Sequence, residues 1–188
     1  MPKSKYKKDD ITSLVLLAQN GDIRALEELI RRIQKHVYAL FSHLTQKKED
    51  ISDLTQEALL KMAKSLSQLK DAKNFKSWLN QIITNIYYDF IRKNPDKTEE
   101  LSPDMLNEIK DKLGCGPGEK CIFTEMEKLI KSSLMSLPRD LRITLVLREY
   151  EGLSYEDIAK ITNTALGTVK SRIARARAKL QSELKEFI

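Results

Sequence analysis

The chain has 188 residues, 41% of them hydrophobic and 32% charged, so it can form one or two small globular domains with ordinary apolar cores. Its formal net charge of +6 favours a polyanionic partner such as nucleic acid or an anionic membrane, although a mildly basic surface explains the charge equally well. The sequence has no apolar run long enough to span a bilayer, no secretory signal, and only two cysteines, so we expect a cytoplasmic protein without membrane insertion or a disulfide scaffold.

Apolar residues at helical spacing predict four helices in the first half of the chain. The first covers residues 11–20 and ends at Asn20-Gly21, a typical helix stop. Asp22 is expected to cap the second helix. Asp50 is expected to cap the third, with Asp53 completing a variant of the capping box.

The fourth helix is predicted over residues 75–93, after a polar connection at residues 70–74. It should end before Pro95, because the residue that precedes a proline avoids the α region. Residues 95–120 are rich in Gly, Pro and acidic side chains and read as a flexible linker, with a short helical piece at 103–113. The side chains expected on the buried face of the fourth helix are Leu79, Ile82, Ile83, Ile86 and Phe90.

The last third of the chain is again predicted to be helical, and no segment alternates as a strand would. We therefore expect an all-α fold with two small helical domains, residues 1–94 and 121–188, joined by the linker 95–120. The helices predicted in the second domain cover residues 121–136, 138–150, 155–161 and 166–187. The first of these carries six apolar residues on one side, Ile122, Phe123, Met126, Leu129, Ile130 and Leu134.

Two short helices joined by a tight turn are predicted after Ser154, and the second of them is strongly basic. Ser154 should cap the first helix, with Asp157 at the third position of that helix. In a helix-turn-helix the first helix needs a small residue at the crossing point, which Ala159 supplies. The turn needs a residue that tolerates positive φ, and Asn163 is acceptable there. The second helix needs an apolar residue facing inward, which Val169 supplies.

The N-terminal half of such a second helix enters the major groove of DNA, while cations further along it hold phosphates. A basic, solvated face on a bundle helix is the alternative explanation, and the packing residues of the motif argue against it. The candidates for base edges and nearby phosphates are Thr168, Lys170, Ser171 and Arg172. The candidates for phosphate contacts are Arg175, Arg177 and Lys179.

Region 4 of the extracytoplasmic-function sigma factors, a branch of the sigma-70 superfamily, resembles residues 137–180, LPRDLRITLVLREYEGLSYEDIAKITNTALGTVKSRIARARAKL. Region 2.2 of the same family resembles DLTQEALLKMAKSL, and regions 2.3 and 2.4 resemble FKSWLNQIITNIYYDFIRK. The departures are Asn163, where the family usually has Gly, and Ala165, where Pro is common. The resemblance covers residues 10–185 and implies a factor that brings core RNA polymerase to promoter DNA and reads the −35 element with its helix-turn-helix.

A mixed stripe of amide, aromatic and cationic side chains on the fourth helix is suited to unpaired bases, because amides bind base edges, rings stack and Arg holds phosphate. The resemblance implies that this stripe and the 70–74 loop engage the −10 element, and that the loop captures a flipped base. Trp78 reads as a core anchor rather than a stacking platform. The residues expected to contact the −10 element are Lys73, Asn74, Gln81, Asn85, Tyr88 and Arg92.

Carboxylates recur every four residues on the third helix at Glu49, Asp53 and Glu57. They could face solvent, complement the helix dipole or bind a metal, although no His or Cys joins them. The resemblance implies a fourth role, in which Asp53, Gln56 and Glu57 dock on the polymerase. It also implies a monomer within the holoenzyme, no cofactor or metal, and control by an anti-sigma factor.

Other functional classes fit less of the sequence. A dimeric helix-turn-helix repressor would leave the first domain unexplained, and a purely structural helical module would leave the basic helix without a role. An enzyme is not expected, because the chain has two histidines, no glycine-rich phosphate loop and no pairing of a nucleophile with a base. Cys115 and Cys121 could form a redox switch or contribute to a metal site, or could lie in a loop without such a role.

Overall fold

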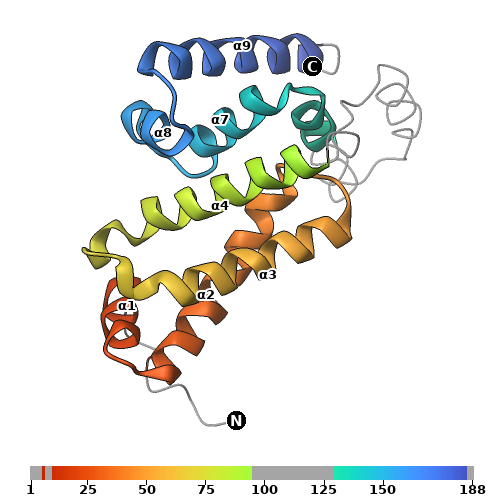
Figure 1. The fold of residues 1–188 in the computed structure, drawn as a ribbon. Coiled ribbons are helices and arrows are strands. Elements are labelled where there is room, and N and C mark those ends of the chain that lie inside the picture. Colours follow the sequence, from red (N-terminus) through yellow and green to blue (C-terminus); the bar gives the residue numbers. More distant parts are fainter. Residues whose placement is uncertain (1–5, 7–9, 95–128, 186–188) are drawn as a thin grey trace. The chain divides into compact units, whose positions relative to one another are not determined.

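In the computed structural model the residues described are 6, 10–94 and 129–185, and within these ranges the chain is helical, without a strand (Figure 1). It divides into two compact units, Met1–Ser42 with Lys47–Phe90, and His43–Gln46 with Ile91–Ile188. The prediction of an all-α fold with two helical domains is confirmed. None of the described helices is long and apolar enough to cross a membrane.

Several predictions from the sequence fall outside the described residues. They concern the linker and its proposed helical piece, both cysteines, residues 121–128 of the next helix and the last residues of the chain. The predicted domain borders at 95 and 120 are among them, so those borders stay predictions.

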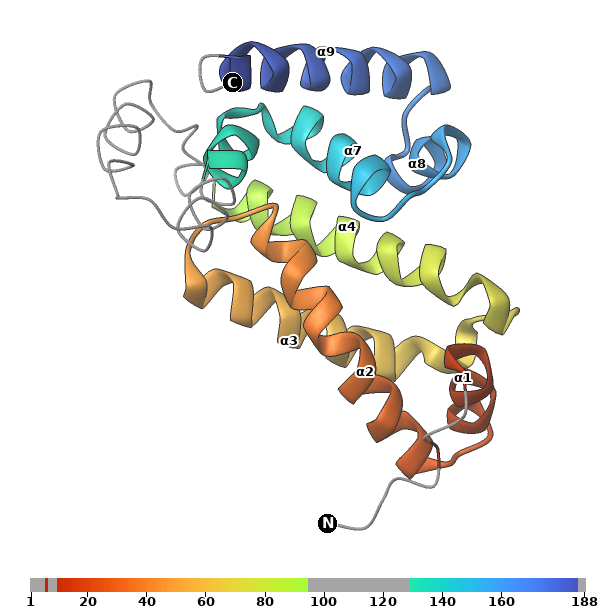
Figure 2. The same cartoon turned by 180° about the vertical axis from the view of Figure 1, so that it is seen from behind.

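The first unit is built from four helices, with α2 packed against both α1 and α3. Two 3-10 turns, η1 and η2, connect α3 to α4, and α1 packs beside both of them, as the opposite views in Figures 1 and 2 show. The helices are α1 (Ile11–Gln19), α2 (Ile23–Ser42), α3 (Lys48–Ser65) and α4 (Phe75–Lys93), and the turns are η1 (Leu66–Gln68) and η2 (Ala72–Asn74).

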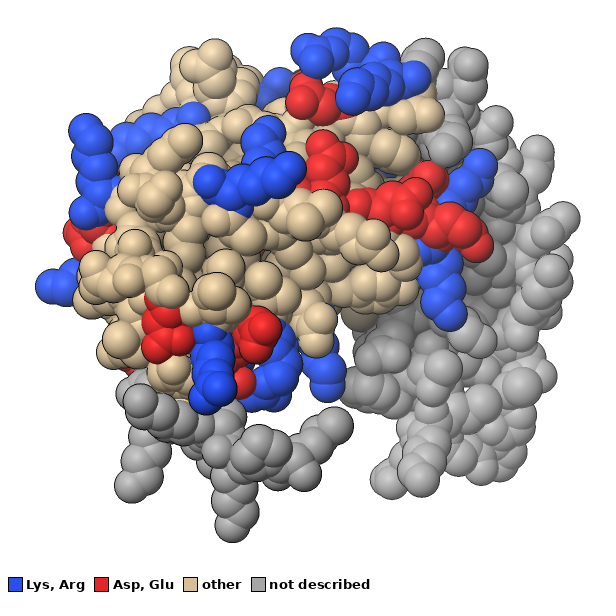
Figure 3. Space-filling view, turned by 60° about the horizontal axis from the view of Figure 1, so that its bottom comes forward, with Lys and Arg blue, Asp and Glu red and all other residues tan. Residues whose placement is uncertain are grey.

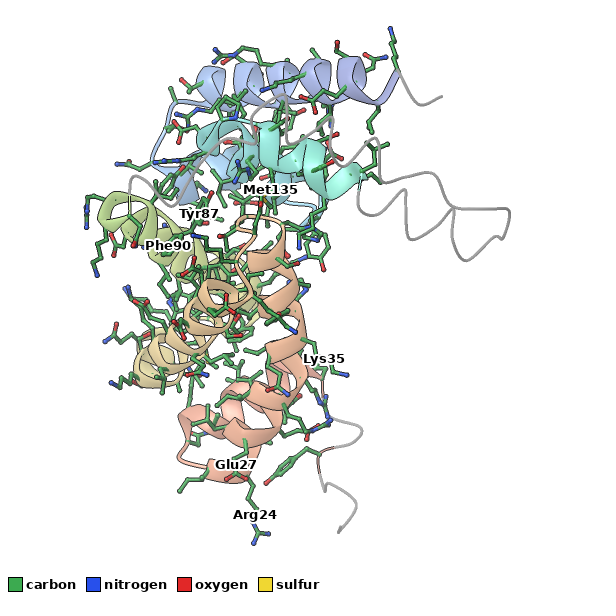
Figure 4. All side chains as sticks on the ribbon, turned by 90° about the vertical axis from the view of Figure 1, so that its right-hand side faces the viewer. Arg24, Glu27, Lys35, Tyr87, Phe90 and Met135 are labelled. Carbon is green, nitrogen blue, oxygen red and sulfur yellow. The ribbon has the colours of Figure 1, made fainter. Side chains whose placement is uncertain are left out.

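Apolar side chains at helical spacing are buried in this unit, as the sequence predicts. The core includes Leu14, Val15, Leu29, Ile33, Val37, Leu40, Phe41, Leu54, Ala58, Met62, Leu79 and Ile83. The outer side of α2 is charged instead, and Arg24 and Lys35 project from it into solvent (Figure 4). On α4 the prediction for Phe90 is wrong, since Phe90 is half-buried and the neighbouring Tyr87 is completely buried.

Aspartates cap the first two helices, which satisfies N–H groups that have no partner inside a helix. The Ser13 N–H donates to Asp10 Oδ1 at 2.7 Å, and the Ala25 N–H donates to Asp22 Oδ1 at 3.0 Å. Asp22 is therefore confirmed as a cap. Asp50 is not a cap, because α3 begins two residues earlier, after Lys47, and Asp50 is buried in the first turn.

A buried carboxylate on α2 is paired with two arginines of the same helix. Glu28 is 6% exposed and accepts hydrogen bonds from Arg31 and Arg32 at 2.5–2.8 Å. Hydrogen bonds from these two guanidinium groups lower the pKa of Glu28 to about 2. Arg32 also donates to the Tyr6 carbonyl, and the Tyr6 hydroxyl donates to Asp22, so these contacts hold the N-terminal segment at Tyr6 against α2.

The second unit contains a helical segment over residues 129–136, followed by α7 (Arg139–Glu149), α8 (Tyr155–Thr162) and α9 (Leu166–Leu184). Helix α7 packs against α8 and α9, which also pack against each other. In the 129–136 segment Leu129 is buried, whereas Ile130 is 45% exposed. The fully buried side chains include Leu137, Ile143, Leu147, Ile158, Val169 and Ala176.

The buried Arg142 organises the end of the 129–136 segment. Its guanidinium donates to the carbonyls of Leu134, Met135 and Leu137 at 2.6–2.9 Å. Carbonyls at the end of a helix lack intrahelical partners, so a buried cation with five N–H donors can satisfy several of them together. Arg142 thereby fixes the angle at which the chain turns into α7.

We expect Ser154→Ala to lower the free energy of unfolding of the second unit by about 1 kcal/mol, because it removes the N-cap of α8. Thermal denaturation followed by circular dichroism measures the change. Ser182→Ala, at an exposed position of α9, is the matched control and should leave the transition unchanged. Equal stability of the two variants would contradict the capping role.

Candidate nucleic-acid interface

The turn of the helix-turn-helix has the geometry that the sequence predicts. At the start of α8, the first helix of the motif, the Asp157 N–H donates to Ser154 Oγ at 3.0 Å, and the Ser154 hydroxyl donates to Asp157 Oδ2 at 2.7 Å. Asn163 follows α8 with φ 51° and ψ 48°, in the left-handed region that Asn tolerates better than most side chains. The Thr164 N–H then donates back to the Ala159 carbonyl at 3.0 Å, which closes the end of the helix.

Helix α9 has a buried side and an exposed side. Val169, Ile173 and Ala176 are at most 1% exposed, so the inward role of Val169 is confirmed. The opposite side carries mostly small residues, and the cations Lys170 and Arg175 lie exposed beside them. Small side chains let a helix backbone approach the base edges, while cations on its flanks reach phosphates. The small exposed residues are Gly167, Ser171, Ala174 and Ala178.

Three of the predicted DNA-binding cations are engaged within the unit. Arg172 Nη2 lies 2.6 Å from Asp140 Oδ2, and the Arg172 side chain is only 16% exposed. Arg177 pairs with Glu149 at 2.5 Å, and this hydrogen bond raises the pKa of the Arg177 guanidinium above its ordinary value. Any DNA contact by these two side chains must therefore compete with, or extend, an existing ion pair.

Lys179 is turned toward the residues that precede α7. Its ammonium group donates to the Ser136 carbonyl at 2.6 Å, and the Ser136 hydroxyl donates to Glu183 Oε1 at 2.7 Å. The sequence does not reveal these partners, because they lie 28 to 47 positions away from α9 residues in the chain. The predicted DNA contacts of all three cations stay predictions.

In the first unit, the predicted loop residues sit on a preorganised turn. Asp71 accepts from the Lys73 backbone N–H at 2.9 Å and from the Asn74 side-chain amide at 3.3 Å. Both Lys73 and Asn74 are exposed. The turn therefore exposes the Lys73 and Asn74 side chains to solvent. The two hydrogen bonds to Asp71 do not involve the Lys73 ammonium group.

The predicted stripe on α4 is accessible along its length. Asn85 and Arg92 are exposed, and Gln81 and Tyr88 are half-buried. The Gln81 amide donates to Asn85 Oδ1 at 3.1 Å, so these two amides form one hydrogen-bonded row. Near the start of α4, the ring centroid of Trp78 lies 6.0 Å from that of Phe75. Trp78 is half-buried, so it is more exposed than a core anchor is expected to be.

An exposed leucine lies among the predicted docking residues of α3. Asp53, Gln56 and Glu57 are all exposed, and Leu60, one turn further along the same side, is 60% exposed. These four residues line a shallow depression together with Lys61 and Lys64. Sequence reasoning missed Leu60, although an apolar residue within a polar helical stripe is the signal that identifies it.

Among the described residues, no group of His, Cys, Asp and Glu side chains converges in a way that could hold a metal ion. On the face drawn in Figure 3, cationic and acidic side chains are interspersed over the described surface. The net charge therefore does not identify a DNA-binding surface, and the cations of each helix have to be considered separately.

Comparisons with known families match both units, in the order that the sequence predicts. Residues 29–95 match the family "Sigma-70 region 2", and residues 127–180 match "Sigma-70, region 4". The first match contains most of α2 and all of α3 and α4, and the second contains α7, α8 and most of α9.

Relatives resemble the chain over nearly its whole length. It is 31% identical to the ECF RNA polymerase sigma-E factor of Haemophilus influenzae, with 94% of this chain and 96% of that protein covered. It is 32% identical to the RNA polymerase sigma-H factor of Pseudomonas aeruginosa, over 93% and 94%. The ECF RNA polymerase sigma-E factor of Escherichia coli is 31% identical, over 96% and 98%.

Two solved structures share the fold. The sigma factor RpoE of Bartonella quintana, solved with the anti-sigma factor NepR, gives a TM-score of 0.65 at 27% identity, with 87% of this chain and 98% of that chain covered. CnrH, solved with the cytosolic domain of CnrY, also gives 0.65, at 21% identity over 94% and 97%. The second likeness is evidence for the fold alone.

We expect Glu149→Gln to raise the affinity of the full chain for random-sequence duplex DNA about two- to threefold at low salt, because it releases Arg177 from an exposed ion pair. Fluorescence anisotropy measures the affinity, and the gain should vanish at high salt. Glu156→Gln makes the same change in charge at an exposed position of α8 and is the matched control. Equal gains in both variants would indicate net charge alone and count against a phosphate contact by Arg177.

Proposed function

The chain belongs to the extracytoplasmic-function branch of the sigma-70 family, and from that premise we propose that it acts as a transcription-initiation factor. It binds core RNA polymerase and directs it to promoters by recognising −35 and −10 elements. The observation that carries this proposal is the presence of both sigma regions in one chain, each with an accessible set of side chains suited to DNA. The chain is not proposed to be an enzyme, and its place of action is the cytoplasm, where the polymerase works.

Recognition of the −35 element is assigned to α9. Thr168, Lys170 and Ser171 lie in its first turns, the part of a recognition helix that reaches base edges in the major groove. The support for this assignment is the buried Val169 side, which leaves the opposite side of α9 available to the groove. The cations assigned to the upstream DNA are Lys170, Arg172, Arg175, Arg177 and Lys179.

Recognition and melting of the −10 element are assigned to the 70–74 loop and α4. Lys73 and Asn74 contact the non-template strand from the loop, and Gln81, Asn85, Tyr88 and Arg92 continue this surface along α4. Their exposure and their mixture of amide, aromatic and cationic groups support the assignment. Binding of the extruded base by the loop would offset part of the few kcal/mol that unstacking that base costs.

Docking on the polymerase is assigned to the exposed side of α3. Asp53, Gln56 and Glu57 surround Leu60, and an apolar anchor within a polar rim is the usual composition of an energetically important contact. The grouping of Leu60 with the three polar side chains in one depression supports docking over the alternative of a solvated helix face.

An anti-sigma factor is proposed as a further partner. The support is that one structural neighbour, the sigma factor RpoE, was solved in a complex with the anti-sigma factor NepR. The domain borders are proposed at residues 1–94 and 121–188, with 95–120 as the linker and one copy of the chain in each holoenzyme.

Run-off transcription tests the proposal directly. The purified chain is mixed with core RNA polymerase and genomic DNA fragments, and the 5′ ends of the transcripts are sequenced. Start sites that depend on the chain and share two upstream elements are the expected result. The proposal fails if chain and core do not associate and no start site depends on their mixture.

We expect Leu60→Ala to weaken association with core polymerase about five- to tenfold, because it removes the apolar centre of the docking surface. Biolayer interferometry with immobilised core measures the affinity. Ile23→Ala is the matched control, since Ile23 is 71% exposed at the start of α2 and is not assigned to the docking surface. An equal loss in both variants would remove the support for docking through α3.

We expect Asn85→Ala to slow formation of the open complex more than it weakens upstream binding, because it deletes an exposed amide of the α4 stripe. Permanganate reactivity of thymines in the melted region reports opening, and footprinting of the upstream element reports binding. Gln34→Ala, at an exposed amide of α2 in the same unit, serves as the control. Normal permanganate reactivity in Asn85→Ala would contradict the assignment.

A further inference from the structure

One side-chain amide links the last residue of α1 to the connection between α3 and α4. Gln19 Nε2 donates to the Leu66 carbonyl at 2.9 Å and to the Leu69 carbonyl at 2.7 Å. An amide NH₂ group has two donor hydrogens, so both can be used here. The acceptors lie 47 and 50 positions away in the chain, and the link is therefore purely tertiary.

The two carbonyls lie where the chain leaves α3 and starts toward the DNA-facing loop. Leu66 is the C-cap of α3, and Leu69, with φ −71° and ψ 110°, is the first extended residue after η1. The last carbonyls of a helix have no intrahelical partner, so an external donor can determine how the chain continues. The Leu69 N–H also donates to the Leu66 carbonyl at 3.2 Å, which tightens the same turn.

An apolar contact accompanies these hydrogen bonds. Leu14 and Val15 of α1 are completely buried, and Leu66, Leu69 and Ala72 of the connection are at most 8% exposed. Helix α1 packs against both η1 and η2, and the two opposite views show it next to this connection (Figures 1 and 2). The root of the loop is thus held by packing, while Gln19 supplies the directional contacts.

The far end of the loop is held separately. Asp71 caps η2 and accepts from the Lys73 backbone N–H and the Asn74 amide, and the Asn74 N–H donates to the Asp71 carbonyl at 3.0 Å. These contacts join residues 71–74 only to one another. The orientation of the loop in the unit therefore depends on the packing at its root and on the Gln19 hydrogen bonds, which fix the carbonyl of Leu69.

We propose that Gln19 is a positioning residue for recognition of the −10 element, which holds the loop carrying Lys73 and Asn74 in its binding orientation before DNA arrives. The inference rests on the proposed function of that loop. Ordering a flexible loop at the moment of binding costs free energy, so a loop ordered in advance binds more tightly and discriminates better between bases. Gln19 itself is not assigned to any DNA contact.

The test compares Gln19→Met with the control Gln34→Met in the full chain. Methionine keeps the length of the side chain and its helix propensity but removes both donors. Gln34 is an exposed position of α2 in the same unit. Hydrogen exchange measured by mass spectrometry should show faster exchange in residues 66–74 of Gln19→Met, with α2 and α4 as protected as in the original chain.

The functional measurement uses holoenzyme and a promoter found by 5′-end mapping. Single-stranded oligonucleotides with the −10 sequence, or with one altered base, compete for binding, and the ratio of their affinities gives the discrimination. We expect Gln19→Met to reduce this ratio by up to about tenfold, the limit set by the free energy of one to two lost hydrogen bonds, with unchanged affinity for core polymerase. Gln34→Met should behave as the original chain.

Several outcomes overturn the inference. One is unchanged exchange in residues 66–74, and another is unchanged base discrimination despite faster exchange. If Gln19→Met loses protection throughout the first unit, Gln19→Ala is used instead, since it removes both donors, keeps a high helix propensity and adds no side-chain bulk. General unfolding in that variant as well would make Gln19 an ordinary stabilising residue. Failure of the original chain to direct any initiation would instead refute the proposed function, and the exchange result would stand apart from it.

Discussion

Backbone groups at helix ends have no partner within their own helix, and in this chain polar side chains satisfy these ends at the places that set the candidate DNA surfaces. Gln19 binds the carbonyls where α3 ends, and Ser154 caps α8 at the start of the helix-turn-helix. Arg142 binds the carbonyls that end the segment before α7. Each contact fixes a chain direction, which apolar packing alone does less well because it is non-directional.

Several cations of α9 are engaged in contacts within the second unit, although the sequence suggests that they are available to DNA. A basic helix suggests that every cation is available to phosphate, yet Arg172 and Arg177 pair with carboxylates of α7 and Lys179 binds a carbonyl. These contacts hold α9 against α7 and stabilise the orientation of the helix. Lys170 and Arg175, which are exposed, are placed to add electrostatic affinity, so the salt dependence of DNA binding should reflect fewer phosphates than the number of cations suggests.

The first unit combines two surfaces with different requirements. The loop and α4 are proposed to discriminate between bases, which requires a defined orientation, and the hydrogen bonds of Asp71, Gln19 and the paired amides Gln81 and Asn85 lie in this part of the unit. The α3 side is proposed to bind a large protein partner, and the exposed Leu60 lies at its centre. The surfaces proposed for the polymerase and for the −10 element are thus built from consecutive elements of one small unit.

The sequence by itself determined the all-α fold, the bounds of α4, the caps at Asp22 and Ser154, and the left-handed turn at Asn163, because all of these depend on local spacing and backbone preference. It was wrong about Asp50 as a cap and about Phe90 as a buried residue, since burial depends on which neighbours arrive from elsewhere in the chain. Only the tertiary structure decided the partners of Arg172, Arg177 and Gln19. Those contacts join residues 28 to 50 positions apart, and no local pattern records which distant polar groups will meet.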